Sequence, residues 1–402
     1  MLFSGTDNHI AGLGQMAEHM GNRELFKGKP GYEGYLNFRV AALSEILQDS
    51  GYLTLMSGKW HFGAAKEHAP CSRGFDKGFV YLPGSGNHYS YKPQFKEGEP
   101  RPSLAVADPN TFWMRDGTYL NRWTKLPDNF YSTKTFTDKL LNYFETRTPE
   151  EKEKPFFSYL AFTAPHWPLH APKEIIDLYK GMYDDGPAGL RQRRLARLIE
   201  LGLVPADVEP APTVGLLDPE WETMSAEERA VSAREMETFA AMVHVVDQHI
   251  QRVLDYLRDS GELDNTFILF ISDNGAEGTL LEALPMLNGD EHGRAHREAL
   301  RQPPRQHRQQ GLLHLVRRAV GLRLDGAVQR LQDLDHRGRH PLPVLKVKCL
   351  VLGAHLWNVA SHMECGVVSI SFLMAKAHGR MLVVVANKCV LFGSCLDCVI
   401  VG

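Results

Sequence analysis

The chain has 402 residues, of which 43% are hydrophobic, and 45 Lys and Arg against 48 Asp and Glu give a net charge of −3. This length and composition suit one large α/β domain or two smaller ones. They exclude a disordered tail protein, a collagen-like fibre and a small disulfide-rich scaffold.

The first 290 residues alternate predicted helices with short apolar strands. A helix is predicted over residues 37–50, because its apolar residues share one face and Gly51 can end it. A second helix is predicted over residues 135–147, and a third from the capping box at residues 225–228 to Gly261. The apolar face of the first helix consists of Val40, Leu43, Ile46 and Leu47. Apolar runs predict strands at residues 53–56, 155–162 and 266–272.

Near-continuous apolar strands between helices are typical of a mostly parallel sheet that helices cover on both faces. In such α/β sheets, ligands bind beyond the carboxyl ends of the strands. Residues 93–129 and 179–220 show no clear period, and we predict that they are long surface insertions.

Ionisable residues follow all three predicted strands at that end. Lys59 and His61 follow the first strand, His166 follows the second, and Asp273 and Asn274 follow the third. Each has an ordinary structural explanation when taken alone, such as an Asx turn at Asp273. Together, an ammonium, two imidazoles and a divalent metal on hard oxygen ligands would neutralise an oxyanion while an ester bond breaks, whether a phosphate or a sulfate ester. Motifs of P-loop nucleotide-binding proteins, zinc proteases and serine hydrolases are absent from the sequence.

Three motifs in this order resemble the type I sulfatases, most closely the bacterial and fungal arylsulfatases. They are Ser-Gly-Lys-Trp-His-Phe-Gly at 57–63, Ala-Pro-His-Trp-Pro-Leu at 164–169 and Ser-Asp-Asn-Gly at 272–275. Segments 2–12 and 28–34 strengthen the resemblance, which covers about residues 1–287. It implies an alkaline-phosphatase-like α/β fold and hydrolysis of a small-molecule sulfate ester by a formylglycine nucleophile beside a bound Ca²⁺.

By this resemblance, Lys59 contacts the nucleophile and the sulfate, and His61 helps to break down the sulfated intermediate. His166 binds the sulfate and serves the leaving group, while Asp273 and Asn274 are two of the calcium ligands. The family's formylglycine motif, Cys/Ser-x-Pro-x-Arg, is absent, and Cys71 lacks the Pro and Arg at the required offsets.

The two aspartates of the family's first strand and a second lysine also have no counterpart in the sequence. We therefore expect a sheet that lacks its N-terminal strand, half a metal site, no nucleophile and an inactive chain. Loss of a central strand would leave unpaired strand edges and exposed apolar surface, so we also expect aggregation.

Residues 289–402 differ from the rest of the chain. Residues 291–340 hold 11 Arg and no Lys, no aromatic residue occurs between Phe270 and Trp357, and five of the six cysteines lie in the last 54 residues. A basic nucleic-acid-binding arm, an irregular cysteine-rich metal module and an out-of-frame or disordered segment all fit this composition. We favour the last interpretation, a partial sulfatase catalytic domain over residues 1–288 followed by an atypical segment over 289–402.

The sequence thus predicts a sulfate-ester hydrolase. The alternatives are a phosphodiesterase or phosphonate hydrolase of the same superfamily, and a non-catalytic protein with a basic arm. No secretory signal is visible, and the best membrane-span candidate, residues 381–402, is interrupted by Lys388 and Asp397. We therefore expect a cytoplasmic protein with neither a membrane nor a nucleic-acid partner.

Overall fold

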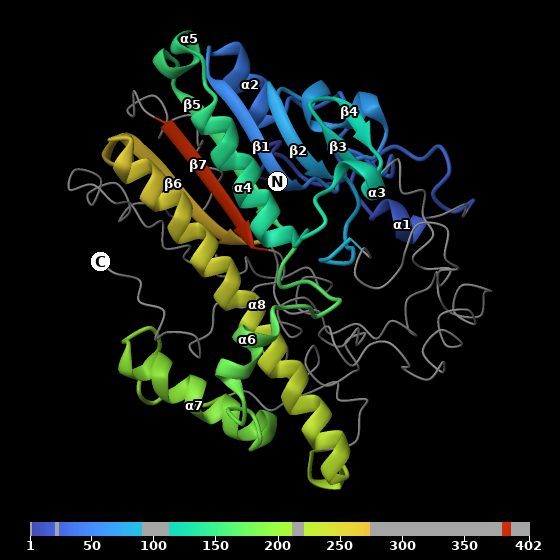
Figure 1. The fold of residues 1–402 in the computed structure, drawn as a ribbon. Coiled ribbons are helices and arrows are strands. Elements are labelled where there is room, and N and C mark those ends of the chain that lie inside the picture. Colours follow the sequence, from blue (N-terminus) through green and yellow to red (C-terminus); the bar gives the residue numbers. More distant parts are fainter. Residues whose placement is uncertain (1, 21–23, 91–111, 211–220, 274–379, 387–402) are drawn as a thin grey trace.

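A seven-stranded sheet with helices on both faces organises the computed structural model, which describes residues 2–20, 24–90, 112–210, 221–273 and 380–386 (Figure 1). The strand order is β4-β3-β2-β1-β5-β7-β6. The strands are β1 (Leu53–Lys59), β2 (Lys77–Tyr81), β3 (Trp113–Arg115), β4 (Thr118–Leu120), β5 (Phe156–Phe162), β6 (Thr266–Ser272) and β7 (Arg380–Ala386). The helices are α1 (Ala17–Met20), α2 (Leu43–Asp49), α3 (Arg122–Lys125), α4 (Ser132–Glu145), α5 (Pro149–Glu153), α6 (Lys173–Ile176), α7 (Gly186–Glu200) and α8 (Ala226–Asp259).

The predicted mostly parallel α/β sheet is confirmed, because β1, β2, β5, β6 and β7 all pair in parallel. β6 has the predicted bounds, and β5 begins one residue later than predicted. β1 continues three residues past its predicted end. Ser57 and Gly58 pair with β2 on one side and β5 on the other, so partner strands extend β1 as far as Lys59.

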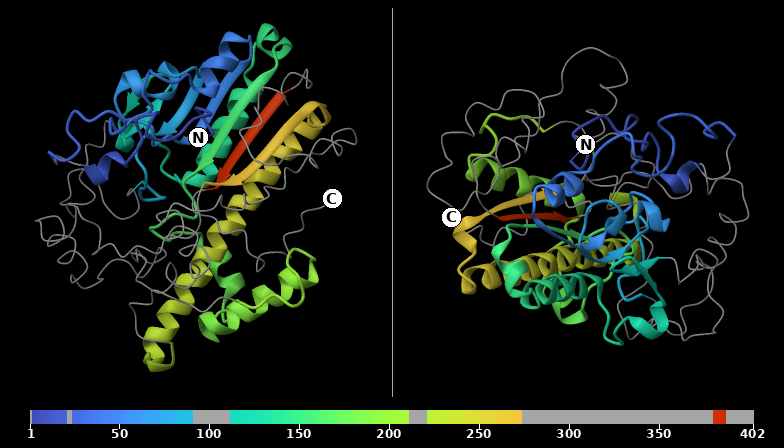
Figure 2. Two further views of the ribbon diagram at one scale, coloured as in Figure 1. Left: turned by 180° about the vertical axis from the view of Figure 1, so that it is seen from behind. Right: turned by 90° about the horizontal axis from the view of Figure 1, so that it is seen from above.

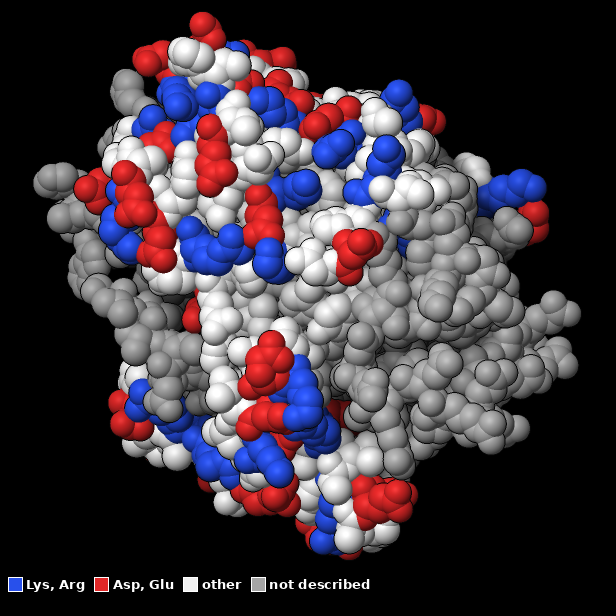
Figure 3. All heavy atoms as spheres, viewed as in Figure 1, with Lys and Arg blue, Asp and Glu red and all other residues white. Residues whose placement is uncertain are grey.

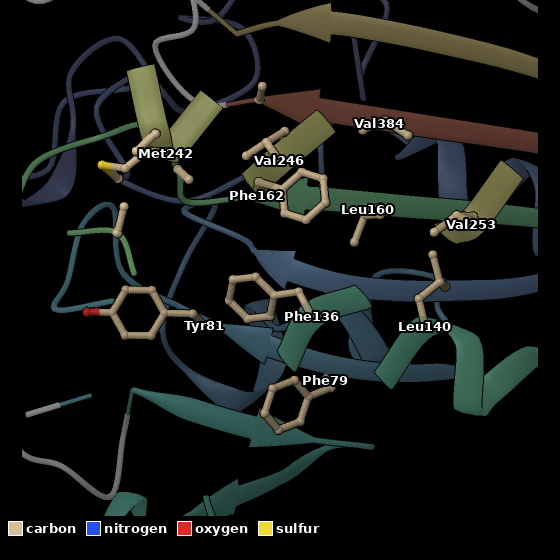
Figure 4. Packing of buried hydrophobic residues seen from close by; sticks show 14 of the residues in the cluster. Phe79, Tyr81, Phe136, Leu140, Leu160, Phe162, Met242, Val246, Val253 and Val384 are labelled. Atoms are coloured by element: carbon tan, nitrogen blue, oxygen red, sulfur yellow. The ribbon is translucent and has the colours of Figure 1, made fainter. Parts of the chain in front are cut away.

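Apolar side chains cover both faces of the central strands, as near-continuous hydrophobic runs predict. On β5, Leu160 and Phe162 belong to the core cluster under α4 and α8, whereas Tyr159 and Ala161 belong to the cluster on the opposite face. Figure 4 shows residues of α4 and α8 packed over the first face, and Figure 2 shows α2 on the other side of the sheet.

β7 lies between β5 and β6, and it pairs with β6 along its whole length and with β5 from Met381 to Ala386 (Figure 1). This strand was not among those predicted from the sequence and belongs to the atypical segment 289–402. Because β7 pairs with both β5 and β6, the edge strands of the described sheet are β4 and β6. Met381, Val383 and Val385 face one core cluster and Leu382 and Val384 the other, so β7 is apolar on both faces.

A group of three buried or half-buried charges holds the start of β7. Arg147 makes a bidentate ion pair with Glu262, at 2.9 and 2.7 Å, and the Nε atom of Arg380 lies 2.9 Å from the same carboxylate. Burial is the largest single influence on the pKa of Glu262, and it raises that pKa. The hydrogen bonds and positive charges around the carboxylate, mainly those of Arg147, together outweigh burial, so the pKa of Glu262 is lowered. An otherwise apolar strand carries little register information, so this contact helps to fix where β7 begins.

The first predicted helix starts at Leu43, six residues later than expected. The buried guanidinium of Arg73 donates to the carbonyls of Asn37 at 3.1 Å and Val40 at 2.9 Å, and also to the Glu45 carboxylate at 2.8 Å. These bonds tie carbonyls of residues 37–40 to a side chain more than 30 residues away and so fix the local backbone. Arg73 therefore holds this segment in a non-helical conformation up to the start of α2.

The prediction that Ile46 lies on the buried face of this helix is wrong, because Ile46 is 50% exposed. α2 has only seven residues, and Ser44 and Leu47 form its buried side. A two-turn helix buries a narrow stripe, and Ile46 falls outside it.

The long helix α8 confirms its predicted ends. The Ser225 hydroxyl accepts from the amide of Glu228 at 3.2 Å, and the Ser225 amide donates to the Glu228 carboxylate at 2.8 Å, as in a capping box. Gly261 follows the last turn with a φ of 70°, the left-handed conformation that favours glycine. None of the helices in the described ranges is both long and apolar enough to span a membrane.

The two predicted irregular insertions are wrong in part. The described end of the first contains the antiparallel hairpin β3–β4 and the short helix α3, and the second contains α7. The hairpin turns at Asp116 and Gly117, which have φ values of 49° and 77°. An Asp-Gly pair is a strong signal for such a turn and was present in the sequence.

The position of β7 between two strands, β5 and β6, leads to a stability prediction. Val383 is 1% exposed, and Val383→Asp places a carboxylate in the core without a partner. We expect the free energy of unfolding to fall by about 4 kcal/mol or more. Val231→Asp, at a position that is 41% exposed on α8, is the matched control and should change it by less than about 1 kcal/mol. Urea denaturation of both variants measures the difference, and equal stabilities would contradict a buried position of β7 between β5 and β6.

Candidate functional site

The strand register brings four carboxyl ends to one edge of the sheet. Gly58 of β1 pairs with Ala161 of β5, and Ala386 of β7 pairs with Phe162 of β5 and Ser272 of β6. Neighbouring strands lie about 4.8 Å apart, so β1 and β6 are about 14 Å apart at this edge. This distance is on the scale of one ligand pocket.

Four of the five predicted site residues lie at this edge. Lys59 is the last residue of β1, and His61 lies two residues beyond it. His166 lies four residues beyond β5, and Asp273 follows β6 directly. The fifth, Asn274, lies outside the described residues.

The segment after β1 is fixed by β2. The amide of Trp60 donates to the Tyr81 carbonyl at 2.9 Å, and the amide of His61 donates to the Leu82 carbonyl at 3.0 Å. Trp60 is buried, whereas Lys59 and His61 on either side of it are half-buried. His61 has a φ of 60°, an unfavourable conformation for a non-glycine residue that the surrounding contacts must maintain.

His166 lies in a tightly bonded loop and is only 7% exposed. Its amide donates to the Thr163 carbonyl at 3.0 Å, and its Nδ1 atom donates to the Trp167 carbonyl at 2.7 Å. A carbonyl can only accept, so Nδ1 carries the proton and Nε2 is the basic nitrogen of the neutral ring. The loop therefore selects one tautomer of His166.

Buried residues that were not predicted from the sequence surround this loop. His88 donates from Nε2 to the His166 carbonyl at 2.9 Å, and the Tyr131 hydroxyl donates to the His170 carbonyl at 3.0 Å. Burial lowers the pKa of His88 to about 4 and raises that of Tyr131. No motif marks these residues in the sequence, because their role comes from contacts between distant segments.

Asp273 is exposed, and its amide donates to the Ala386 carbonyl at 3.3 Å. Burial raises the pKa of the Tyr159 hydroxyl, and the nearby charge of Asp273 raises it further. Within the described residues, no three His, Cys, Asp or Glu side chains converge on a point that could hold a metal ion. Asp273 alone does not make a Ca²⁺ site, since Ca²⁺ takes six to eight oxygen ligands. Of the two predicted calcium ligands, the described residues include Asp273 alone, and the predicted half site stays a prediction.

Cys71 does not have the properties of a nucleophile. Burial, together with the charge of Asp116, raises the pKa of its thiol to about 11, so it is protonated at neutral pH. Asp116 forms the hairpin turn beside Gly78, at the start of β2, and its amide donates to the Gly78 carbonyl at 2.8 Å. Cys71 therefore lies toward the end of the sheet opposite the candidate site.

Gly58 directly precedes Lys59 and allows β1 to approach β5. Its φ is 126°, and a Cβ atom there would lie 1.9 Å from the Ala161 carbonyl oxygen. We expect Gly58→Ala to lower the free energy of unfolding by about 3 kcal/mol or more, since both backbone strain and a backbone clash result.

Gly51→Ala is the matched control for this prediction. Gly51 has a φ of 85° but no atom within 4 Å of its Cβ position, so it introduces strain without a clash. We expect it to lower the free energy of unfolding by about 1 kcal/mol. If chemical denaturation gives equal losses of the free energy of unfolding for Gly58→Ala and Gly51→Ala, the close approach of β1 to β5 at Gly58 does not contribute to stability.

Comparison with known proteins gives the following matches. The model of the sulfatase family matches residues 1–312. An uncharacterized sulfatase of Schizosaccharomyces pombe is 51% identical over 289 residues, which cover 72% of this chain and 50% of the relative. An arylsulfatase of Klebsiella aerogenes is 36% identical over 288 residues, with 71% and 58% covered. The crystal structure of Ps i-CgsB aligns with a TM-score of 0.45 and 22% identity over 69% of this chain and 47% of that one. The chain spans about half the length of the curated relatives it matches.

Proposed function

We propose that the edge of the sheet at the carboxyl ends of β1, β5, β7 and β6 binds the sulfate group of a small-molecule ester, since the chain belongs to the sulfatase family. The observation that carries this proposal is the strand register, which brings Lys59, His166 and Asp273 to one end of the sheet. An aryl sulfate is the substrate class we favour, since a 36% identical relative is named an arylsulfatase.

In this proposal, the Lys59 ammonium and the protonated, cationic rings of His61 and His166 neutralise the anionic sulfate. The basic Nε2 atom of His166 is the group that, once protonated, would deliver a proton to the leaving oxygen. The covalent step of the family needs a formylglycine, and the printed sequence has no Cys/Ser-x-Pro-x-Arg motif. We therefore assign sulfate binding and proton transfer to these residues, and we expect no turnover by this chain alone.

The alternative of a nucleic-acid-binding protein rests on residues 291–340, which lie outside the described ranges. On the described face formed by α4 and α8, acidic and basic side chains are intermixed (Figure 3). Asp138 of α4 pairs with both Lys134 and Arg252 on this face. Charges that alternate in sign give little attraction for a polyanion, so this face lends the alternative no support.

Sulfate binding tests the proposed site directly. We expect inorganic sulfate to bind the chain in isothermal titration calorimetry, and Lys59→Met to weaken the affinity about tenfold, because a charge-assisted contact is lost. Lys152→Met removes an exposed lysine of α5, which precedes β5 at the other end of the sheet, and should leave the affinity unchanged. An equal loss in both variants, or no binding by the wild type, would exclude the site.

Paired esters test the reaction class. The chain with the printed sequence should hydrolyse neither an aryl sulfate nor the matching aryl phosphate above the buffer rate. Turnover of the sulfate at a rate typical of enzymes, about 1 s⁻¹ or more, would contradict the expected lack of a nucleophile. Turnover of the phosphate ester alone would favour the phosphodiesterase alternative.

A further inference from the structure

The buried histidine His88 connects three separate segments beside the candidate site. It is 1% exposed and lies in the loop after β2. Its Nε2 atom donates to the His166 carbonyl at 2.9 Å, and its Nδ1 atom lies 2.8 Å from the hydroxyl of Ser132, the first residue of α4. The Ser132 amide also donates to the His88 carbonyl at 2.8 Å, so side chain and backbone of His88 are both held.

The hydrogen bonds of His88 are compatible with one tautomer. The His166 carbonyl can only accept, so Nε2 of His88 carries the proton and Nδ1 accepts from the Ser132 hydroxyl. The Thr163 hydroxyl lies 3.3 Å from the Ser132 oxygen and donates to it. Because burial lowers the pKa of His88 to about 4, the ring is neutral near pH 7 and keeps this pattern.

The helix that supports His88 is itself anchored to the strand that ends in Lys59. The Ser57 hydroxyl of β1 donates to the Phe136 carbonyl of α4 at 2.7 Å. A second bond to the His166 loop comes from Tyr131, just before α4, to the His170 carbonyl. A continuous set of buried hydrogen bonds therefore links β1, the start of α4 and the loop that carries His166.

We propose that His88 is a positioning residue that fixes the imidazole of His166 at the carboxyl edge of the sheet. The ring of His166 bonds to the carbonyl of the next residue, Trp167, so its orientation follows the local backbone. His88 holds that backbone through the His166 carbonyl. This inference rests on the proposed function, in which His166 contacts the sulfate group.

Two variants of His88 separate the hydrogen bond from the bulk of the ring. His88→Phe retains a buried ring but has no donor for the His166 carbonyl, whereas His88→Gln retains a donor near the position of Nε2. Ser132→Ala is a milder variant that removes the hydroxyl bonded to Nδ1. Val253→Ala, a fully buried position of α8 outside this set of contacts, controls for a general loss of stability.

Two readouts are measured on the whole chain by NMR with ¹⁵N-labelled histidine. The first is the tautomer of His166 from its ring ¹⁵N shifts, and the second is the affinity for inorganic sulfate. We expect His88→Phe to give a mixture of His166 tautomers and to weaken sulfate binding about tenfold, the scale of one lost buried hydrogen bond. His88→Gln should stay within about threefold of the wild type, and Ser132→Ala should shift both readouts in the same direction as His88→Phe but less.

Val253→Ala should lower the melting temperature and leave both readouts unchanged. The inference is overturned if His88→Phe keeps the wild-type tautomer and affinity, if His88→Gln loses as much as His88→Phe, or if Val253→Ala shifts both readouts equally. If His88→Phe does not fold, Ser132→Ala decides, and no change in its His166 tautomer overturns the inference. A wild type that binds no sulfate would refute the proposed function, while the His166 tautomer in the variants would still decide the role of His88.

Discussion

Parallel pairing among β1, β5, β7 and β6 is the constraint on which the candidate site depends. Lys59 and His61, His166, and Asp273 follow β1, β5 and β6 at separate places in the chain. Main-chain hydrogen bonds set the register, and the register brings Lys59 to the level of Ser272, about three strand spacings away. Both faces of these strands pack against apolar clusters, so the hydrophobic pattern alone does not set the register, and contacts such as the ion pair of Arg380 with Glu262 help to fix it.

Buried polar side chains determine the conformation of the segments next to the sheet. Arg73 binds carbonyls ahead of α2 and keeps that stretch non-helical, and His88 binds the carbonyl of His166. Both residues are almost completely buried, and a buried donor or acceptor without a partner is costly. Because Arg73 and His88 must keep hydrogen-bond partners in the core, the loop carbonyls that they bind are held in place.

β7 belongs to the atypical segment 289–402 but pairs with strands of the first 288 residues. The family model matches residues 1–312, whereas β7 comes from residues 380–386 and still lies inside the sheet, between β5 and the edge strand β6. Its alternating contacts with both core clusters, and the ion pair of Arg380 with Glu262, account for its fit between β5 and β6. The end of β7 contributes the Ala386 carbonyl that binds the amide of Asp273, so this strand also shapes the edge where we place the site.

The sequence by itself determined the elements whose signals are local. The bounds of β6, the capping box at Ser225 and the end of α8 at Gly261 follow from hydrophobic period and cap chemistry, and short motifs marked Lys59, His61, His166 and Asp273. The tertiary structure alone decided the extension of β1 to Lys59, the late start of α2, the position of β7 and the contacts of His88. Each of these depends on hydrogen bonds or packing between residues far apart in the chain, and such contacts leave no periodic trace in the sequence around either partner.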